Sequence, residues 1–314
     1  MADKEHQNLT PKTALQLAAP HTWAASVTPV LLSAAIVFSE QKTLDLPLFF
    51  VLLAICILMQ SAVNTFNDYF DLKKGADTEK DAVEETDAVL VYKNIPPAQA
   101  LMLGTGFLLA AAVLAVLPVM KGGLPVLLTG LAGAVVVILY SAGPVPLSYL
   151  PVGECVSGFV MGCLIPLGCY ISLTGGIVRL SVMLETLPVA YGIAMIMLTN
   201  NTCDVEKDTA SGRKTLPVLL GRERAAVLYR ICMFVWVTLM GVFVVVFLPR
   251  FRTLGFPVLP IAVLALVIFH VGMIFSFKQA RLIRQEALRP SLMKRASAAT
   301  FLYGISLTLA WIIR

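Results

Sequence analysis

The sequence predicts an all-α integral membrane protein, a single bundle of nine transmembrane helices with a cytoplasmic N-terminus. Composition is the first reason: of 314 residues, 58% are hydrophobic and only 14% are charged, against about 25% charged in a soluble domain. Mean hydropathy is +0.83. The second reason is pattern, because the apolar residues form long continuous runs rather than the short alternating segments of a membrane β-barrel. The third is the uneven placement of Lys and Arg between those runs.

Each apolar run approaches or exceeds the roughly 17 residues that a spanning helix needs. Tight Pro and Gly breaks separate several neighbours, such as Gly143-Pro144-Val145-Pro146. We interpret residues 1–314 as one domain, in which 1–20 form a polar N-terminal segment and 67–97 and 203–224 form cytoplasmic loops. The expected spans are 22–39, 47–66, 98–119, 123–140, 152–174, 182–202, 225–248, 256–276 and 297–313.

The Lys and Arg count sets the expected orientation. With the N-terminus in the cytoplasm, 18 of the 24 Lys and Arg residues fall on the inner side, as the positive-inside rule requires. The second and sixth spans then both end at the cytoplasmic face. We therefore expect a multi-pass protein of the cell membrane, with its active site toward the cytoplasm.

Two short segments hold eleven of the nineteen acidic residues, and they follow those two spans. A carboxylate at a helix centre in the membrane costs about 2.5–3.5 kcal/mol, so this gathering indicates a cationic ligand. Residues four apart share a face of a helix, and this spacing predicts two facing polar stripes. One stripe comprises Asn64, Asp68 and Asp71, with Asn67 and Asp71 as an overlapping pair; the other comprises Asn200, Asp204 and Asp208.

Basic residues accompany both stripes. Lys73, Lys74, Arg213 and Lys214 follow the acidic positions closely and can contact phosphate oxygens directly. Carboxylates mixed with cations indicate a metal–phosphate site, and Mg²⁺ is the expected ion because it takes oxygen ligands together with substrate phosphates. We interpret the other acidic residues between 79 and 87 as a solvated loop.

These motifs resemble the UbiA superfamily of intramembrane aromatic prenyltransferases, whose two motifs are N-x-x-x-D-x-x-x-D and D-x-x-x-D. The second is complete as Asp204-x-x-x-Asp208. The first is Asn67-x-x-x-Asp71, with Gly75 in place of the last Asp and Asp77 two positions on. That variant, and the segment from Tyr140 to Tyr149 (YSAGPVPLSY), resemble the 1,4-dihydroxy-2-naphthoate polyprenyltransferase (MenA) branch.

The chain also departs from the family pattern in two places. Ala19 stands where an Arg usually precedes the Pro of the first segment, and residues 82–94 are acidic where a Gly-Gly stretch is usual.

The resemblance implies Mg²⁺-dependent transfer of a prenyl group from a polyprenyl diphosphate to an aromatic acceptor. In the branch named above the acceptor is 1,4-dihydroxy-2-naphthoate, which loses its carboxylate and yields demethylmenaquinol in menaquinone biosynthesis. The expected metal ligands are Asp71, Asp77, Asp204 and Asp208, and the expected catalytic residues are Asp71, Asp204, Asp208, Asn67 and Tyr140. Substrate contacts are expected from Asn64, Asp68, Lys73, Lys74, Asn200, Arg213, Lys214 and Tyr149.

Several alternatives stay open at this point. Tyr140 and Tyr149 fit an acceptor pocket and an interfacial aromatic belt about equally well. The acceptor can be 4-hydroxybenzoate instead. A lipid diphosphate hydrolase would use a similar metal site, and a cation transporter would also place acids in a membrane, although across its depth. The lipid bilayer is the expected environment; we expect no nucleic acid partner and no obligate protein partner.

Overall fold

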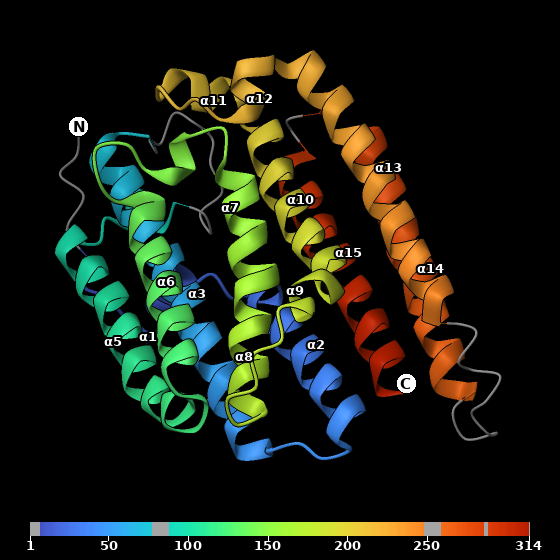
Figure 1. The fold of residues 1–314 in the computed structure, drawn as a ribbon. Helices are drawn as coiled ribbons and strands as arrows, with labels where there is room; N and C mark the ends of the chain where they lie inside the picture. Colours follow the sequence, from blue (N-terminus) through green and yellow to red (C-terminus); the bar gives the residue numbers. More distant parts are fainter. Residues whose placement is uncertain (1–6, 77–87, 248–258, 286–287, 314) are drawn as a thin grey trace.

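The computed structural model describes residues 7–76, 88–247, 259–285 and 288–313, and this part of the chain forms helices without any strand (Figure 1). Seven of its helical segments are long and apolar enough to cross a membrane, so the all-helical membrane class is confirmed. They are α2 (Ala24–Gln41), α3 (Leu46–Lys74), α5 (Pro97–Gly122), α6 (Leu124–Ser141), the rod Gly153–Leu173, α13 (Arg222–Phe247) and α14 (Leu259–Leu282). The rod joins α7 (Gly153–Phe159), the π-helix η4 (Val160–Leu164) and α8 (Ile165–Leu173).

Two further long helices pack within the bundle. One is α10 (Leu187–Cys203), which at 17 residues is shorter than the seven. The other is α15 (Arg289–Ile312), whose first two turns include Arg289, Lys294 and Arg295. Both are central rather than peripheral, because α10 packs against α7, α13 and α15, and α15 packs against α2, α10 and α14.

Proline and glycine set many of the helix boundaries. Pro47, Pro97 and Pro125 lie in the first turns of α3, α5 and α6, where proline fixes φ and no intrahelical donor is lost. Gly75 ends α3 in the left-handed conformation, with φ +69°, which glycine adopts without strain. The expected polar stripe of Asn64, Asp68 and Asp71 therefore lies on one continuous helix, and residues 67–74, expected as part of a cytoplasmic loop, are helical.

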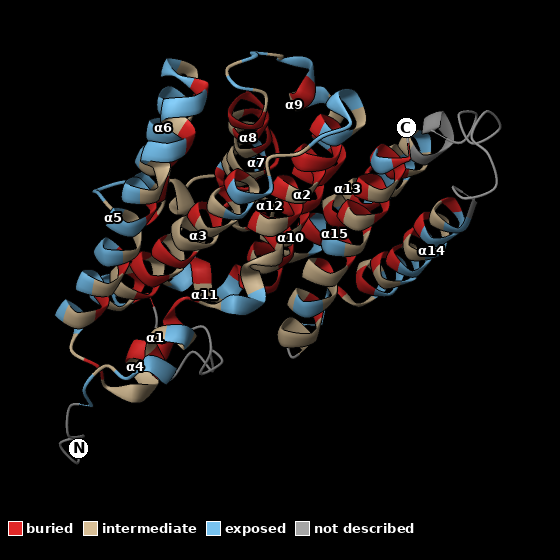
Figure 2. Ribbon diagram, turned by 90° about the horizontal axis from the view of Figure 1, so that it is seen from below, coloured by how far each residue is buried: buried red, intermediate tan, exposed pale blue. Residues whose placement is uncertain are grey.

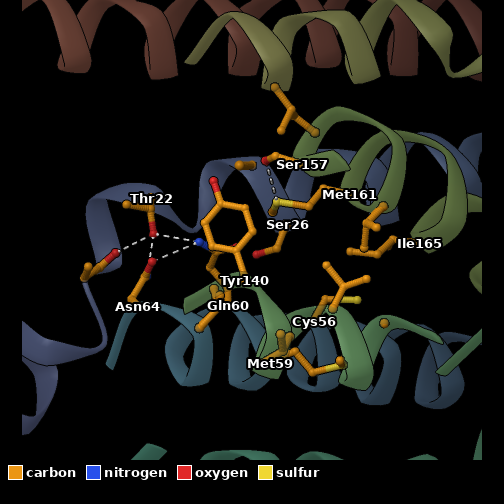
Figure 3. Close-up of a pocket in the computed structure, with 18 of the residues that line it drawn as sticks. Thr22, Ser26, Cys56, Met59, Gln60, Asn64, Tyr140, Ser157, Met161 and Ile165 are labelled. Atoms are coloured by element: carbon orange, nitrogen blue, oxygen red, sulfur yellow. Dashed lines mark hydrogen bonds between the residues drawn. The ribbon is translucent and has the colours of Figure 1, made fainter. Parts of the chain in front are cut away.

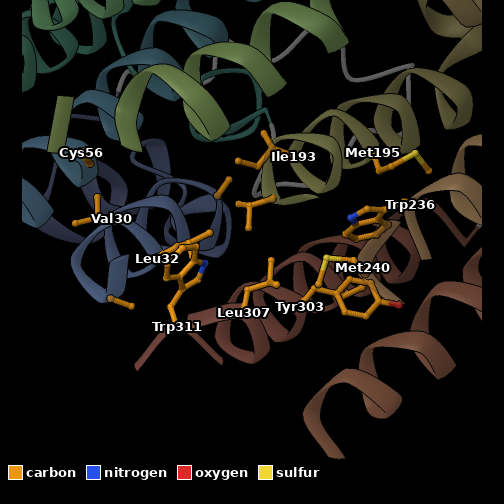
Figure 4. Packing of buried hydrophobic residues seen from close by; sticks show 14 of the residues in the cluster. Val30, Leu32, Cys56, Ile193, Met195, Trp236, Met240, Tyr303, Leu307 and Trp311 are labelled. Carbon is orange, nitrogen blue, oxygen red and sulfur yellow. The ribbon is translucent and has the colours of Figure 1, made fainter. Parts of the chain in front are cut away.

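The core lies around α2, and the outer helices carry few buried residues. In α2, 61% of the spanning window is buried, against 17% in α5 and 11% in α6, and Figure 2 shows this contrast. The main cluster joins α2, α8, α10, α13 and α15 around Trp236, Tyr303 and Trp311 (Figure 4). Trp236 and Tyr303 meet edge to face, with ring centroids 4.8 Å apart, a favourable aromatic geometry.

Close helix packing depends on glycine where the α7–α8 rod meets α10. A Cβ built on Gly162, inside the π-helix η4, would lie 2.1 Å from the Ala190 Cα. One turn earlier, a Cβ on Gly158 would lie 2.7 Å from the Ala190 carbonyl oxygen. Small residues allow this approach, as they do at other membrane helix contacts.

We call the end of the bundle where α3 and α10 finish the motif end. Short helices gather around it, and Figure 1 shows two of them, α11 (Val205–Ala210) and α12 (Leu216–Leu220), lying across that end. Near the start of α5, α1 (Pro11–Leu17) and α4 (Val89–Lys93) share a small apolar cluster. The other short elements are η1 (Pro20–Thr22), η3 (Leu147–Tyr149) and α9 (Ser181–Glu185).

Candidate functional site

The first motif lies on the last two turns of α3, where neighbouring side chains hold Asp71 in place. The Asn67 amide donates to Asp71 Oδ2 at 2.9 Å. The Ser141 hydroxyl, at the end of α6, donates to Asn67 Oδ1 at 3.0 Å. Lys74 Nζ in turn donates to the Ser141 carbonyl at 3.0 Å. This chain of hydrogen bonds fixes the orientation of the Asp71 carboxylate and ties α3 to α6.

The second motif lies on a bent segment instead of one continuous helix. Asn200 is in the last turn of α10, Asp204 is the residue that ends α10, and Asp208 belongs to α11. The i to i−4 hydrogen-bond pattern of a helix is still present across the bend, because the Asp208 N–H donates to the Asp204 carbonyl at 2.8 Å. The expected single stripe is therefore bent at Asp204.

Arg213 joins the two motifs. Its Nη2 lies 2.6 Å from Asp71 Oδ1 and its Nη1 lies 3.5 Å from Asp208 Oδ1. The turn that places it is local, since the Arg213 N–H donates to the Asp208 carbonyl at 2.9 Å. The two acidic segments, which are more than 130 positions apart in the sequence, thus meet at one end of the bundle.

A second guanidinium serves the other acidic position. Arg289 Nε lies 2.8 Å from Asp204 Oδ1, and its Nη2 donates to Asn200 Oδ1 at 2.7 Å. Arg289 opens α15, so this contact brings a third long helix to the site. The sequence reasoning missed this role: it counted Arg289 only as a cytoplasmic charge, and no local pattern links residues 85 positions apart.

The carboxylates at the site are buried. Asp71, Asp204 and Asp208 are 4%, 9% and 2% exposed, and an uncompensated charge at such a position is costly. Burial raises the pKa of Asp208 to about 6; the Arg213 guanidinium opposes this rise and the nearby Asp204 carboxylate adds to it. Asp208 therefore depends on cationic neighbours to stay ionised near neutral pH.

Tyr149 lies between two of the cations. Lys74 Nζ and the Arg213 guanidinium carbon each lie 4.8 Å from the centre of its ring, within the range of cation–π attraction. The Tyr149 carbonyl also accepts from the Lys214 N–H at 2.9 Å. The loop between α6 and α7 thereby holds the end of α3 against the segment that follows the second motif.

The site opens into a cavity of about 1050 Å³. Asp71, Asp204, Arg213, Lys207 and Arg289 line its motif end, and Tyr140 lines the wall beside them. The rest is mainly apolar, with side chains from α2, α3, α5, α6, the α7–α8 rod and α10. An apolar pocket with a few convergent polar groups is the usual form of a small-molecule site.

Part of the cavity wall near Tyr140 is polar (Figure 3). The Asn64 amide donates to the Thr22 hydroxyl at 2.8 Å and to the Ala18 carbonyl at 3.1 Å, and the Gln60 amide donates to Asn64 Oδ1 at 3.3 Å. Asn64 therefore anchors the segment before α2 to α3. Deeper in the same view, Cys56, Met59, Met161 and Ile165 form an apolar wall.

The structure places other predicted residues differently. Asp68 accepts the Val89 N–H at 3.0 Å and so caps α4, although it also lines the cavity. Lys73 is exposed, with Nζ 5.9 Å from the Tyr69 ring centre. The Lys214 side chain is exposed, and neither lysine lines the cavity. Asp77 lies outside the described residues.

The sequence reasoning also missed a buried pair beside the second motif. The Asn201 amide donates to Glu154 Oε1 at 2.8 Å, and both residues are 5% exposed. This contact fixes the start of α7 against the end of α10. Lys207, which lines the cavity, was likewise noted only as a charge on the cytoplasmic side.

The donor set fits Mg²⁺. Within the described ranges, no three or more His, Cys, Asp or Glu side chains form a group placed to hold a metal alone. Mg²⁺ does not need such a cage, because it usually keeps several waters and takes one or two carboxylates together with substrate phosphates. Asp71 and Asp208, on either side of Arg213, supply carboxylates of this kind.

Comparison with known proteins gives a consistent family. Residues 26–310 match the UbiA prenyltransferase family. The chain is 35% identical over 213 residues to the 1,4-dihydroxy-2-naphthoate octaprenyltransferase of Bacillus subtilis, a match that covers 68% of this chain and 67% of that protein. It is 28% identical over 219 residues to the UbiA prenyltransferase domain-containing protein 1 of Danio rerio, covering 69% of this chain and only 63% of that protein.

Solved structures with the same fold come from Archaeoglobus fulgidus. A UbiA homolog from this organism aligns with a TM-score of 0.63 at 20% identity, over 96% of this chain and 99% of that one. The same homolog bound to DMAPP and Mg²⁺ aligns with a TM-score of 0.58 at 18% identity, over 94% and 99%. With paired acidic motifs, an apolar cavity and a match along nearly its whole length, the chain belongs to the UbiA prenyltransferase family and is a multi-pass membrane prenyltransferase.

Proposed function

We propose that this protein transfers a polyprenyl group from an allylic diphosphate to 1,4-dihydroxy-2-naphthoate, with loss of the ring carboxylate and formation of a demethylmenaquinol. One observation carries the proposal: Arg213 contacts carboxylates of both motifs at the mouth of a long apolar cavity. The relative in Bacillus subtilis, a 1,4-dihydroxy-2-naphthoate octaprenyltransferase, supports this acceptor over 4-hydroxybenzoate.

The site residues divide the binding of the diphosphate between them. Asp71, Asp204 and Asp208, with Asp77, would hold Mg²⁺, which when bound would neutralise the diphosphate and stabilise the charge that develops as it leaves. Arg213 and Arg289 exchange part of their contact with the carboxylates for phosphate oxygens, which guanidinium groups bind well. Asn67 keeps Asp71 in the orientation that this arrangement needs.

The transfer step takes place in the cavity, whose wall shields the reacting atoms. The allylic C–O bond breaks, and the prenyl carbon bonds to the electron-rich ring. The ring carboxylate leaves as CO₂, so the electrons of its C–C bond return to the ring and no external oxidant is needed. Tyr140 lines the cavity beside its acidic end, and we assign it the role of shielding the prenyl carbon as the C–O bond breaks. The apolar walls exclude water, which would otherwise convert the diphosphate to a prenol.

Product identity tests this function directly. Purified protein in lipid nanodiscs, with Mg²⁺ and a polyprenyl diphosphate, is incubated with 1,4-dihydroxy-2-naphthoate or with 4-hydroxybenzoate, and the products are identified by mass spectrometry. We expect a prenylated, decarboxylated naphthoquinol that requires Mg²⁺ and disappears with EDTA. Prenylated hydroxybenzoate as the main product would overturn the acceptor. Prenol and pyrophosphate released without an acceptor would indicate a hydrolase.

We also infer that α10 and α15 complete nine spans and that the motif end faces the cytoplasm. Their central packing and the 18 of 24 basic residues on that side support this orientation. Cys155 is exposed near the motif end, and Lys121 is exposed at the other end of α5. An impermeant maleimide should label Cys155 only in inside-out vesicles. Lys121→Cys, in a Cys155→Ser background, should be labelled only in right-side-out vesicles, and the reverse pattern contradicts the orientation.

A further inference from the structure

The cavity extends far beyond the acidic end. On α3 its lining runs from Asp71 to Leu52, an axial length of about 28 Å at 1.5 Å per residue. Met120, Val126 and Ser172 line its other end. A polyprenyl chain held at Arg213 by its diphosphate can therefore run through most of the bundle.

One stretch of the cavity wall has very short side chains. It lies where α5 and α6 face the cavity, and its members are Ala111, Ala112, Ala115, Gly130, Gly133 and Ala134. The two glycines differ in their surroundings. A Cβ on Gly133 would contact Met59 Cε at 3.5 Å, whereas a Cβ on Gly130 meets no heavy atom within 4 Å in the described part of the chain.

Gly130 therefore has no packing reason to lack a side chain. Its φ is not in the left-handed region, and glycine inside a helix costs about 1 kcal/mol relative to alanine. The open space beside Gly130 belongs to the cavity. Gly130 lies ten positions from Tyr140 on α6, which is about 15 Å along the helix axis. A larger side chain at Gly130 would therefore narrow the cavity about 15 Å from its acidic end.

We propose that Gly130 determines the length of prenyl chain that the enzyme accepts, by leaving the far part of the cavity open to long chains. This inference rests on the proposed function. An extended chain gains about 1.2 Å per bond, so a geranyl chain spans about 8 Å and ends before Gly130. An octaprenyl chain spans about 37 Å on the same basis, passes Gly130, and is longer than the cavity.

The far part of the cavity also reaches exposed helix surfaces. Met120 and Val116 of α5 line it and are 79% and 56% exposed, and Leu131 of α6 lines it and is 53% exposed. A chain longer than the cavity can therefore leave the protein between exposed side chains of α5 and α6 and continue into the lipid.

The experiment compares two exposed helix-interior glycines, of which only Gly130 lines the cavity. Gly130→Leu fills the proposed path, and Gly130→Ala is the smaller step. Gly106→Leu is the matched control: Gly106 is a helix-interior glycine of α5 whose Cβ also meets nothing within 4 Å, but it does not line the cavity. Mg²⁺-dependent dissociation constants are measured for geranyl and octaprenyl diphosphate in nanodiscs, without acceptor.

We expect Gly130→Leu to weaken octaprenyl diphosphate binding by at least about tenfold, equivalent to ~1.4 kcal/mol, while geranyl diphosphate binding stays unchanged. Gly130→Ala should show a smaller effect in the same direction, and Gly106→Leu should bind both like the wild type. Unchanged octaprenyl binding in Gly130→Leu, or equal losses for both chain lengths, overturns the inference. The inference is also overturned if Gly130→Leu changes only the oligomeric state of the protein, because Gly130 would then be a contact between helices of neighbouring copies. If the wild type binds neither diphosphate, the proposed function itself fails.

Discussion

Single residues at this site serve both the folded state and the substrate. Arg213 compensates two buried carboxylates in the protein alone, and the same guanidinium is proposed to bind phosphate. When Arg213 moves from the carboxylates to the phosphate, Mg²⁺ would take its place beside the carboxylates. No buried charge would then be left unpaired. Sequence spacing placed Asp71 and Asp208 on two polar stripes, but it had no means to show that Arg213 lies between their carboxylates.

Tyr149 provides a test of how the cations are positioned. Its ring contacts both Lys74 and Arg213, and such contacts contribute about 0.5–2 kcal/mol. Tyr149→Leu should therefore raise KM for the prenyl diphosphate about three- to tenfold with little change in kcat, whereas Tyr149→Phe, which keeps the ring, should stay close to wild type. Steady-state kinetics at saturating acceptor measures both. A Phe variant as impaired as the Leu variant would mean that the hydroxyl matters instead.

Asp208 predicts a pH dependence of binding. Its pKa is raised to about 6 by burial, so in the metal-free protein it takes up a proton as the pH falls through 6, and that proton competes with Mg²⁺. Protonation of Asp208 should therefore lower the affinity for Mg²⁺ and prenyl diphosphate about tenfold for each pH unit below 6. Isothermal titration between pH 5 and 8 measures it.

The diphosphate titrates in a similar range, so Asp208→Asn serves as the control. This variant should bind more weakly at every pH and lack the part of the pH dependence that belongs to Asp208. Identical pH profiles for the wild type and the variant would contradict the assignment.

At the scale of helices, the site depends on where two of them stop. The long α3 carries its motif to Lys74 and stops at Gly75, while α10 stops at Asp204 and leaves Asp208 to α11. The Gly75 stop was visible in the sequence, because glycine commonly ends helices in the left-handed conformation. The bend at Asp204 was not visible, because the i, i+4 spacing of Asn200, Asp204 and Asp208 fits an uninterrupted helix equally well.

Gly162 tests the helix packing that supports the second motif. Its added Cβ would lie 2.1 Å from the Ala190 Cα on α10, and backbone has little freedom to move away. Gly162→Ala should therefore lower stability by about 1–3 kcal/mol, the usual cost of overpacking, and reduce the thermal midpoint of the detergent-solubilised protein. Gly106→Ala, in open space, is the control and should leave the midpoint within error. Equal midpoints for the two variants would show that α7–α8 and α10 pack less closely.

At the scale of the whole molecule, the distribution of basic residues predicted the common location of the two acidic segments, which the lengths of the apolar runs did not. Counting Lys and Arg placed both acidic segments at one face, and the Arg213 contacts place them at one end of the bundle. Length and composition support seven of the nine expected spans, since α10 is short and α15 begins with basic residues. Apolar runs alone had no means to locate the cavity, because its walls come from helices that are distant in the sequence.

The central claim is that the carboxylates of both motifs act together on one Mg²⁺–diphosphate group. The most direct measurement is prenyl transfer by Asp71→Asn and Asp208→Asn in purified, folded protein. The control is Asp45→Asn, which alters a helix-capping carboxylate paired with Lys121 at the opposite end of the bundle. We predict that both motif variants lose at least about 10²-fold in kcat while Asp45→Asn keeps near-normal turnover. Near-normal turnover in either motif variant would contradict the claim.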